Sequence, residues 1–307
     1  MTASVPKNPP PLKPGMDNPW YDYVPFPQRP KLVWPRNARV GWFVLLHLEY
    51  WELLPDEKSH KDPRHVGEFG SFVPDYRTWT QRDYGARVGV FRLLEVLDRY
   101  GLKATVAANS SAARRYPYVV EALQKRGYEF AGHGRFANEM ITGAMSEDAE
   151  RDLIAGSLGE LKAATGVRPV GWVGQDYGES ARTPRLLAEA GVQYVLDWPN
   201  DDQPYLMDAG GAPLVSIPSQ PEWDDVQQLW LRRLGMDLYP KMVGEAFETL
   251  HGEGGRIFVL SLHPWLIGMA HRIAYLDQAL HRLLQFGGVW KTTAAEAATH
   301  FRSVTEA

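Results

Sequence analysis

Three side chains that can move protons each follow a short apolar run of the sequence: Glu49, His133 and His263. A carboxylate and two imidazoles that meet at one place can act as general base and general acid on water or on a carbonyl group. Glycines on both sides of His133 permit close approach of a ligand, and the proline after His263 restricts its backbone to an extended conformation. We therefore predict that Glu49, His133 and His263 are the catalytic residues.

Aromatic and polar residues near the same points of the chain could bind a substrate. Indole rings are suited to wall a compact planar ligand. Core packing accounts equally well for a single Trp, and Asp is common in turns, so each residue also has a structural interpretation. The predicted substrate-binding residues are Trp51, Asn138, Asp176, Trp198, Asp201 and Trp265.

The elements that must position these residues alternate between strand and helix patterns. Short apolar runs predict strands at 39–48, 103–108, 128–132, 170–173, 192–197, 214–217, 256–262 and 289–291. Helical patterns lie between them, at 85–100, 112–126, 146–165, 183–191, 241–251 and 271–286. About eight such units predict an α/β fold, an irregular (β/α) barrel of parallel strands with its site at the carboxyl ends of the strands. The stretches 52–82 and 200–211 are longer than ordinary connections, which is typical of functional segments.

Composition excludes several other classes of protein. The 307 residues include 33 basic and 37 acidic ones, a balance that does not suit a partner such as nucleic acid. The absence of Cys excludes disulfides, thiolate zinc sites and Cys nucleophiles. The N-terminus lacks the apolar stretch of a secretory signal, and the longest apolar run, 42–46, is too short to span a bilayer. We expect a cytoplasmic protein with no membrane or nucleic-acid partner that acts on a small molecule.

The first 37 residues differ from the rest of the chain. Their many prolines exclude helix and central strand, so residues 1–37 are predicted to form an extended arm before a single barrel domain at 38–307. The arm carries Trp20, Tyr21 and Phe26, which we expect to pack on the chain's own barrel or on a neighbouring subunit. Because apolar surface favours association, we predict a homo-oligomer.

The order of these motifs resembles that of the polysaccharide deacetylase superfamily, including its allantoinase-like and cyclic-imide-hydrolase-like members. The resemblance covers about residues 40–305. The segments that carry it are 103–106, 130–134, 165–172, 197–205 and 260–268, followed by His271 and Arg272. Segment 260–268 is closest to the allantoinase-like branch. The resemblance implies an irregular (β/α) barrel and a hydrolase that acts on non-peptide carbon–nitrogen bonds.

The chain departs from the pattern of the metal-dependent members at two ligand positions. Glu49 stands where the family has Asp, and Ala137 lies four residues after His133, where the family has a second His. Glu49 and His133 could still hold a divalent metal such as zinc, or Glu49 could activate water directly. Without a strong metal site, an activated small cyclic amide (an imide or ureide) is favoured as substrate. The alternatives are a metal-dependent N-deacetylase of amino sugars and an inactive barrel that binds a small ligand.

Overall fold

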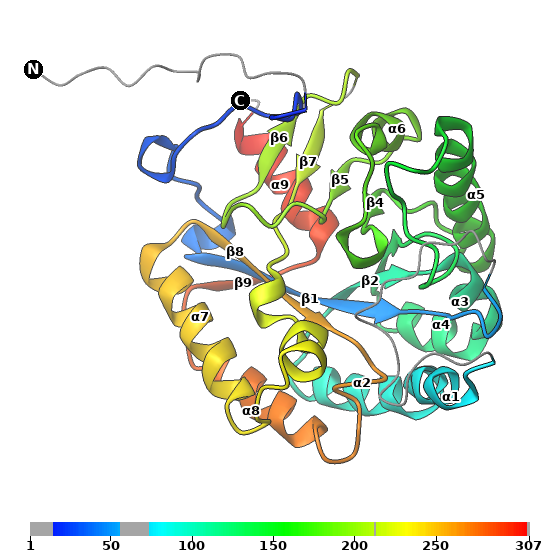
Figure 1. Ribbon diagram of the computed structural model, residues 1–307. Coiled ribbons are helices and arrows are strands. Elements are labelled where there is room, and N and C mark those ends of the chain that lie inside the picture. The colour runs from blue at the N-terminus through cyan, green and yellow to red at the C-terminus, as the bar shows by residue number, and fades with distance from the viewer. Residues whose placement is uncertain (1–14, 56–73, 212, 306–307) are drawn as a thin grey trace, which may run out of the picture.

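The computed structural model describes residues 15–55, 74–211 and 213–305. Within them lies one curled sheet, with hydrogen-bonded order β6-β7-β5-β4-β3-β2-β1-β8 and β9 paired to β1 (Figure 1). Among the described residues, all strand pairs of this sheet are parallel except β6 with β7. The predicted irregular (β/α) barrel is thereby confirmed. The strands are β1 Val40–Leu48, β2 Ala104–Ala108, β3 Glu129–Gly132, β4 Gly171–Trp172, β5 Tyr194–Val195, β6 Tyr205–Met207, β7 Leu214–Ser216, β8 Arg256–Leu262 and β9 Val289–Lys291.

Helices follow most strands and cover the outside of the sheet (Figure 1). Sequence signals explain where several of them begin and end. Ser146 caps α5 by accepting a hydrogen bond from the backbone of Ala149, and Gly166 ends it in a left-handed conformation. The helices are α1 Tyr76–Tyr84, α2 Val90–Arg99, α3 Ser110–Arg115, α4 Pro117–Gln124, α5 Glu147–Thr165, α6 Thr183–Glu189, α7 Tyr239–Glu253, α8 Ile273–Leu283 and α9 Ala294–Thr305.

Strand β1 is buried on both faces, and the alternation of its side chains decides which residues reach the site. Its even-numbered side chains pack against α2, α4, α7 and α8 in the outer core. Phe43 and Leu45 belong instead to the inner core, which they share with Ile257 and Val259 of β8. Successive side chains of a strand point to opposite faces. The side chains of His47 and Glu49 therefore lie on the inner face of β1, towards its carboxyl end. Those of Ser261 and His263 lie on the inner face of β8 in the same way.

The opposite, amino-terminal side of this inner core is closed by apolar residues. Helix α9 contributes Ala294, Ala297 and Phe301 to the inner core, and Trp34 from the segment before β1 joins them. The Trp34 indole nitrogen donates to the carbonyl of Arg256, 2.8 Å away. This end of the interior is therefore closed mainly by hydrocarbon, together with one buried polar group in which Glu129 accepts hydrogen bonds from Thr105 and Tyr194.

Some expectations about elements were wrong. The stretch 52–82 is not irregular throughout, because α1 begins at Tyr76, capped by Asp75, and continues through a wider turn at Gly85–Gly89 into α2. The stretch 200–211 contains β6, an antiparallel edge strand of only three residues. Helix α9 was not predicted. The helix expected over 112–126 is divided at Tyr116, because the residue before a proline is disfavoured in helical conformation.

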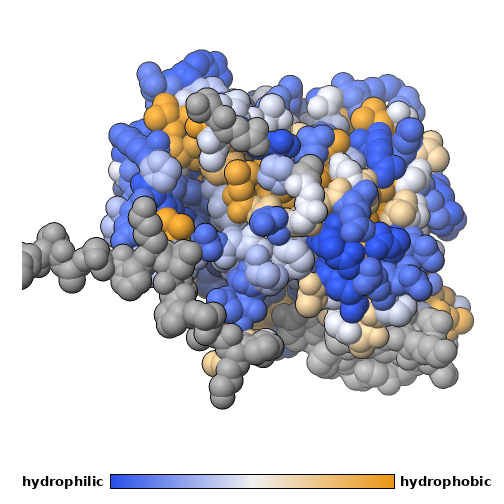
Figure 2. All heavy atoms as spheres, turned by 90° about the horizontal axis from the view of Figure 1, so that it is seen from above, coloured by the Kyte–Doolittle hydropathy of each residue, from blue (hydrophilic) through white to orange (hydrophobic). Residues whose placement is uncertain are grey.

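The described part of the N-terminal arm packs on its own barrel. Tyr21 meets Trp198 edge-on at 5.8 Å between ring centroids, and Trp20 packs against the same hydrophobic cluster. Phe26 lies under the guanidinium of Arg256. Tyr23 and Phe26 nevertheless remain more than half exposed. Seen from above, this side of the molecule mixes hydrophobic and hydrophilic patches (Figure 2). Residues 1–14 of the predicted arm lie outside the described residues, and the homo-oligomer stays a prediction.

Across the part of the chain that the structure describes, no helix combines the length and the apolar character needed to cross a bilayer.

Candidate active site

The three predicted catalytic residues come together at the carboxyl ends of three strands. Glu49 follows β1, His133 follows β3 and His263 follows β8, and all three side chains are almost fully buried. Strands β1, β2 and β3 are neighbours, and β8 lies on the other side of β1. The parallel register therefore brings residues that are more than 80 positions apart in sequence to one edge of the sheet.

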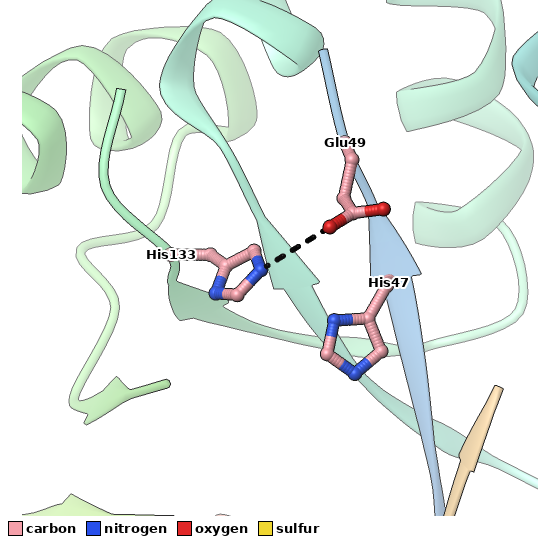
Figure 3. Close-up of side chains that lie close together, drawn as sticks. All are labelled: His47, Glu49 and His133. Carbon is pink, nitrogen blue, oxygen red and sulfur yellow. Dashed lines mark ion pairs between the residues drawn. The ribbon is translucent and has the colours of Figure 1, made fainter. Parts of the chain in front are cut away.

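Glu49 and His133 face each other across a short gap (Figure 3). His133 Nε2 lies 3.8 Å from Glu49 Oε1, and Nδ1 lies 2.6 Å from the carbonyl oxygen of Val173. A carbonyl can only accept, so Nδ1 carries a hydrogen, and Nε2 is the ring nitrogen that faces Glu49. Burial raises the pKa of Glu49, but the interaction with His133 and the charge of His263 outweigh it and hold that pKa well below its usual range.

His47 is the first functional candidate that the sequence analysis missed. Its ring stacks on His263 at 4.0 Å between centroids and meets the His133 ring edge-on at 5.2 Å. Nε2 lies 2.9 Å from Ser261 Oγ, while buried Nδ1 has no hydrogen-bond partner among the described residues. Burial and the two neighbouring imidazoles lower the pKa of His47 well below its ordinary value, so the ring is neutral. Its position two residues before Glu49 is the signal that could have found it.

His263 is held by a carboxylate that the sequence analysis also missed. Asp225 accepts from the His263 ring at Nδ1 (2.6 Å) and from its backbone nitrogen (2.9 Å). Asp224 Oδ2 lies 3.9 Å from the same Nδ1. Burial alone would lower the pKa of His263, but Asp225 and Asp224 raise it to about 9. His263 is therefore protonated at neutral pH, and Nε2 is the ring nitrogen left to donate.

Two further contacts fix the Glu49 carboxylate. The side-chain amide of Gln175 donates to Oε1 at 3.0 Å, and the Trp265 indole donates to Oε2 at 3.3 Å. Both oxygens are thus aimed by neutral donors that leave the negative charge in place. Gln175 begins the short turn Gln175–Tyr177 after β4, where Asp176 takes a left-handed backbone conformation. Gln175, the neighbour of the predicted Asp176, makes this contact with Glu49.

The predicted aromatic residues Trp51 and Trp265 line one side of the cluster around a third missed residue. The Arg82 guanidinium lies 3.3 Å from the ring centroid of Trp265 and 4.8 Å from that of Trp51. The ring centroid of Trp230 lies 5.5 Å from the same guanidinium, so three indoles surround it, and we call these three residues the Trp cage. Burial lowers the pKa of Arg82 to about 10 against the opposing influence of Glu49, so the group keeps its charge at neutral pH. A cation against the faces of indole rings is stabilised by the ring quadrupole.

The other predicted substrate-binding residues have structural contacts. Asn138 accepts from the backbone nitrogen of Glu52 at 2.8 Å and donates to its carboxylate, which fixes the segment after β1. Trp198 donates to Glu179 and packs on Tyr21 of the arm. Asp201 forms an ion pair with Arg29. The contacts of Trp198 and Asp201 thus connect the arm to the barrel, and among the described residues neither side chain forms a hydrogen bond or ion pair with Glu49, His133 or His263.

Comparisons with known proteins agree with this architecture. The family model described as polysaccharide deacetylase matches residues 79–195, a span that runs from α1 to β5 and contains His133. A probable polysaccharide deacetylase from Pseudomonas aeruginosa shares 26% identity, with a TM-score of 0.80 over 90% of this chain and 95% of that one. The chain therefore resembles the polysaccharide deacetylase superfamily both in sequence and in fold.

The names of similar proteins indicate different activities. A peptidoglycan deacetylase-like protein of Gibberella zeae is 26% identical over 260 residues, which cover 71% of this chain and 76% of that protein. The structure of PuuE allantoinase matches with a TM-score of 0.80 and 26% identity, over 94% of this chain and 98% of that one. The superfamily resemblance expected from the sequence is confirmed, and an allantoinase is among its structural neighbours. The comparisons support a polysaccharide deacetylase-like hydrolase.

Deacetylases of this superfamily commonly use a divalent metal, and the described residues offer a donor set for one. His47, Glu49 and His133 each have a ligand atom within 4.8 Å of the others. Two of these atoms, His47 Nδ1 and His133 Nε2, are buried without a hydrogen-bond partner, and the second nitrogen of each ring is held by Ser261 or Val173. Two oriented imidazoles and a carboxylate suit zinc or a similar cation. The residues present therefore fit the metal, with His47 in addition to the predicted Glu49 and His133.

An alternative donor set, His47, Asp224 and His263, is less suitable. The Nδ1 hydrogen of His263 is already donated to Asp225, and Asp224 accepts from the backbone nitrogen of Gln227 at 2.9 Å. Since both sets use His47, only one of them can hold an ion at a time. The set with Glu49 has more free lone pairs.

Proposed function

We propose that this protein hydrolyses a non-peptide carbon–nitrogen bond in a small cyclic amide, an imide or ureide, and so opens the ring. The observation that carries the proposal is the pairing of an ionised carboxylate, Glu49, with a protonated imidazole, His263, at one buried edge of the sheet. A base that is charged and an acid that is protonated at the same pH are the two groups that amide hydrolysis needs.

The proposed roles follow from the hydrogen-bond partners. His263 has Nδ1 fixed on Asp225, so Nε2 would donate the proton to the departing ring nitrogen. Glu49, aimed by Gln175 and Trp265, would take the proton from the attacking water. His133, whose Nδ1 is held by the backbone carbonyl of Val173, would orient the carbonyl group of the substrate or serve as a metal ligand.

If a divalent cation is bound, the same residues take part in the reaction, but some of their roles change. His47, Glu49 and His133 would hold it. When bound, such an ion supplies charge that polarises a carbonyl group and lowers the pKa of a bound water. His263 lies beside this donor set, stacked on His47, and its proton remains available for the leaving nitrogen.

The surroundings of the cluster support a small substrate. His133 and His263 are each less than 9% exposed, and the indoles of Trp51, Trp230 and Trp265 stand close together around Arg82 beside Glu49. Enclosed sites of aromatic walls with a few polar groups are typical for compact planar ligands. A polymer would need an open groove along the surface. PuuE allantoinase, whose name indicates a ureide substrate, matches nearly the whole chain.

Deacetylation of an amino sugar is the second candidate function. It is supported by the deacetylase-like relative of Gibberella zeae and by the metal-type donor set of His47, Glu49 and His133. Both candidates use the same acid and base, and they differ in the nitrogen that departs: in ring opening it stays tethered to the new carboxylate, whereas in deacetylation it leaves as the free amine of the sugar and the acetyl group becomes acetate.

Parallel incubations separate the two candidates and a third possibility, binding without turnover. The protein is incubated with succinimide, hydantoin and allantoin, and separately with N-acetylglucosamine oligomers, with and without added zinc. We expect ring-opened acid from a cyclic compound, and its loss in His263→Ala but not in His281→Ala, an exposed histidine on α8. Acetate release without ring opening would contradict the proposal, as would tight binding of all cyclic compounds without product.

A further inference from the structure

Arg82 is a buried cation with no hydrogen-bond partner among the described residues. The residue is 6% exposed, and its Nε, Nη1 and Nη2 atoms are all buried and unpartnered within the part of the chain that the structure describes. Guanidinium is a planar group with five N–H donors along its edge. Burying such donors without acceptors is unfavourable, so an unpaired buried guanidinium requires an explanation.

The three surrounding indoles explain only part of this arrangement. Trp265, Trp51 and Trp230 lie within 5.5 Å of the guanidinium carbon and can stabilise its positive charge. Ring faces interact with the charge, whereas the N–H groups at the edge still need acceptors. The cage therefore holds a cation in place and leaves its hydrogen-bonding capacity unused.

The local packing fixes Arg82 beside the reacting groups. Arg82, Gly85 and Gly89 are spaced three and four residues apart, so they share one helical face. A Cβ at Gly85 would lie 2.7 Å from the backbone nitrogen of Trp265, and one at Gly89 would overlap the carbonyl of Pro264. The two glycines let this helix contact the segment after β8 directly. Trp265, on which Arg82 stacks, is also the residue that donates to Glu49.

We propose that Arg82 is the anion-binding residue of this site and that the substrate is a small cyclic amide bearing a carboxylate. The edge of the guanidinium would take both carboxylate oxygens in a bidentate pair, the geometry for which Arg is preferred over Lys. The carboxylate would lie in the Trp cage while the ring carbonyl lies at Glu49. The cyclic amide in this inference rests on the proposed function, whereas its carboxylate rests on Arg82 and the Trp cage.

Binding of a charged ring and of its neutral isostere tests the proposal without requiring turnover. The probes are hydantoin-5-acetate and hydantoin-5-acetamide, titrated into the full chain by calorimetry. We expect the carboxylate to bind the wild-type protein at least about 10-fold more tightly than the amide, as a charge-assisted bidentate pair should. Arg82→Gln should abolish that preference, and Arg82→Lys should retain only part of it.

Arg87→Gln is the matched control, because it removes the same charge from a mostly exposed side chain in the adjoining helical turn. It should leave the preference unchanged. Equal affinities of the two probes for the wild-type protein would overturn the proposal. So would the same preference in Arg82→Gln as in the wild type. If Arg82→Gln does not fold, Arg82→Lys decides, since an unchanged preference there would contradict bidentate recognition.

Thermal stability separates ligand recognition from a structural role. The carboxylate probe should raise the Tm of the wild type and of Arg87→Gln more than the amide probe does, and this difference should vanish in Arg82→Gln. A lower Tm in Arg82→Gln with an unchanged probe difference would assign Arg82 to the fold alone. A carboxylate preference without ring opening would contradict the proposed function and support the role of Arg82. Ring opening without that preference would support the proposed function and contradict the role of Arg82.

Discussion

Replacing Asp225 by Asn should lower the pKa of His263. The Asp225 carboxylate lies 2.6 Å from Nδ1 and also accepts from the His263 backbone nitrogen. Asn keeps the shape of the side chain but carries no charge. Burial then dominates, with Asp224 at 3.9 Å as the nearer remaining carboxylate, and the pKa should fall from about 9 towards the ordinary value of 6.5.

The magnitude follows from the size of that shift. A rise from 6.5 to about 9 corresponds to about 3 kcal/mol of preference for the protonated ring. Because the folded state holds this proton more tightly than the unfolded chain, the resulting stability is fully present below pH 6.5 and is lost as the pH rises through 9. Because burial also raises the pKa of Asp225 to about 6, Asp225→Asn should destabilise the protein most between about pH 6 and 9, by at most about 3 kcal/mol, and by clearly less above about pH 9.

Two measurements check this prediction. The imidazole resonances of His263, assigned with His263→Ala, are titrated by NMR in protein treated with a chelator, and urea unfolding is followed at both ends of the pH range. Asp152→Asn, the same change at an exposed position of α5, is the control and should alter neither result. The reasoning is refuted if His263 titrates near 6.5 in the wild type, or if its midpoint is the same in Asp225→Asn.

Four further predictions concern catalysis, metal and assembly. Glu49→Gln should fold normally and lower turnover ~100-fold or more, the scale of a positioned acid–base group, and near-normal turnover would remove Glu49 from the mechanism. His263→Ala should reduce the rate less on an acidic imide, whose nitrogen leaves readily, than on a ureide, and a larger loss on the imide would contradict the acid role. His47→Ala and His133→Ala should each weaken zinc binding by about 10-fold or more in equilibrium dialysis, whereas unchanged zinc binding would exclude this donor set. Light scattering should give a homo-oligomer, and a monomer at micromolar concentration that is unaffected by deleting residues 1–30 would refute that.

The sequence predicted those site residues whose position depends only on the strand pattern. Glu49, His133 and His263 each follow an apolar run, and the rule that parallel strands place their carboxyl ends at one edge was enough to group them. His47 lies within an apolar strand and is not among the predicted site residues. Its inner-face position becomes visible only when the two-residue alternation is continued from Leu45 to Glu49.

Other parts of the site depend on contacts that no local pattern encodes. Asp225 lies in a segment between β7 and α7 that carries no periodic signal, and only the fold brings it to His263. Arg82 falls in a stretch interpreted as irregular, because Tyr76–Tyr84 has a weakly amphipathic sequence rich in polar residues. Helix α9 was missed because its buried face consists mainly of alanines, which give little contrast in hydrophobicity.

Ring opening in oxygen-18 water tests the central claim most directly. Protein incubated with a cyclic imide or ureide is analysed by mass spectrometry, with His263→Ala as the inactive reference. The account predicts a ring-opened product with one oxygen-18 in its new carboxylate, formed by the wild type and strongly reduced in the variant. An intact ring in every cyclic compound, together with labelled acetate from N-acetylglucosamine oligomers, would contradict it.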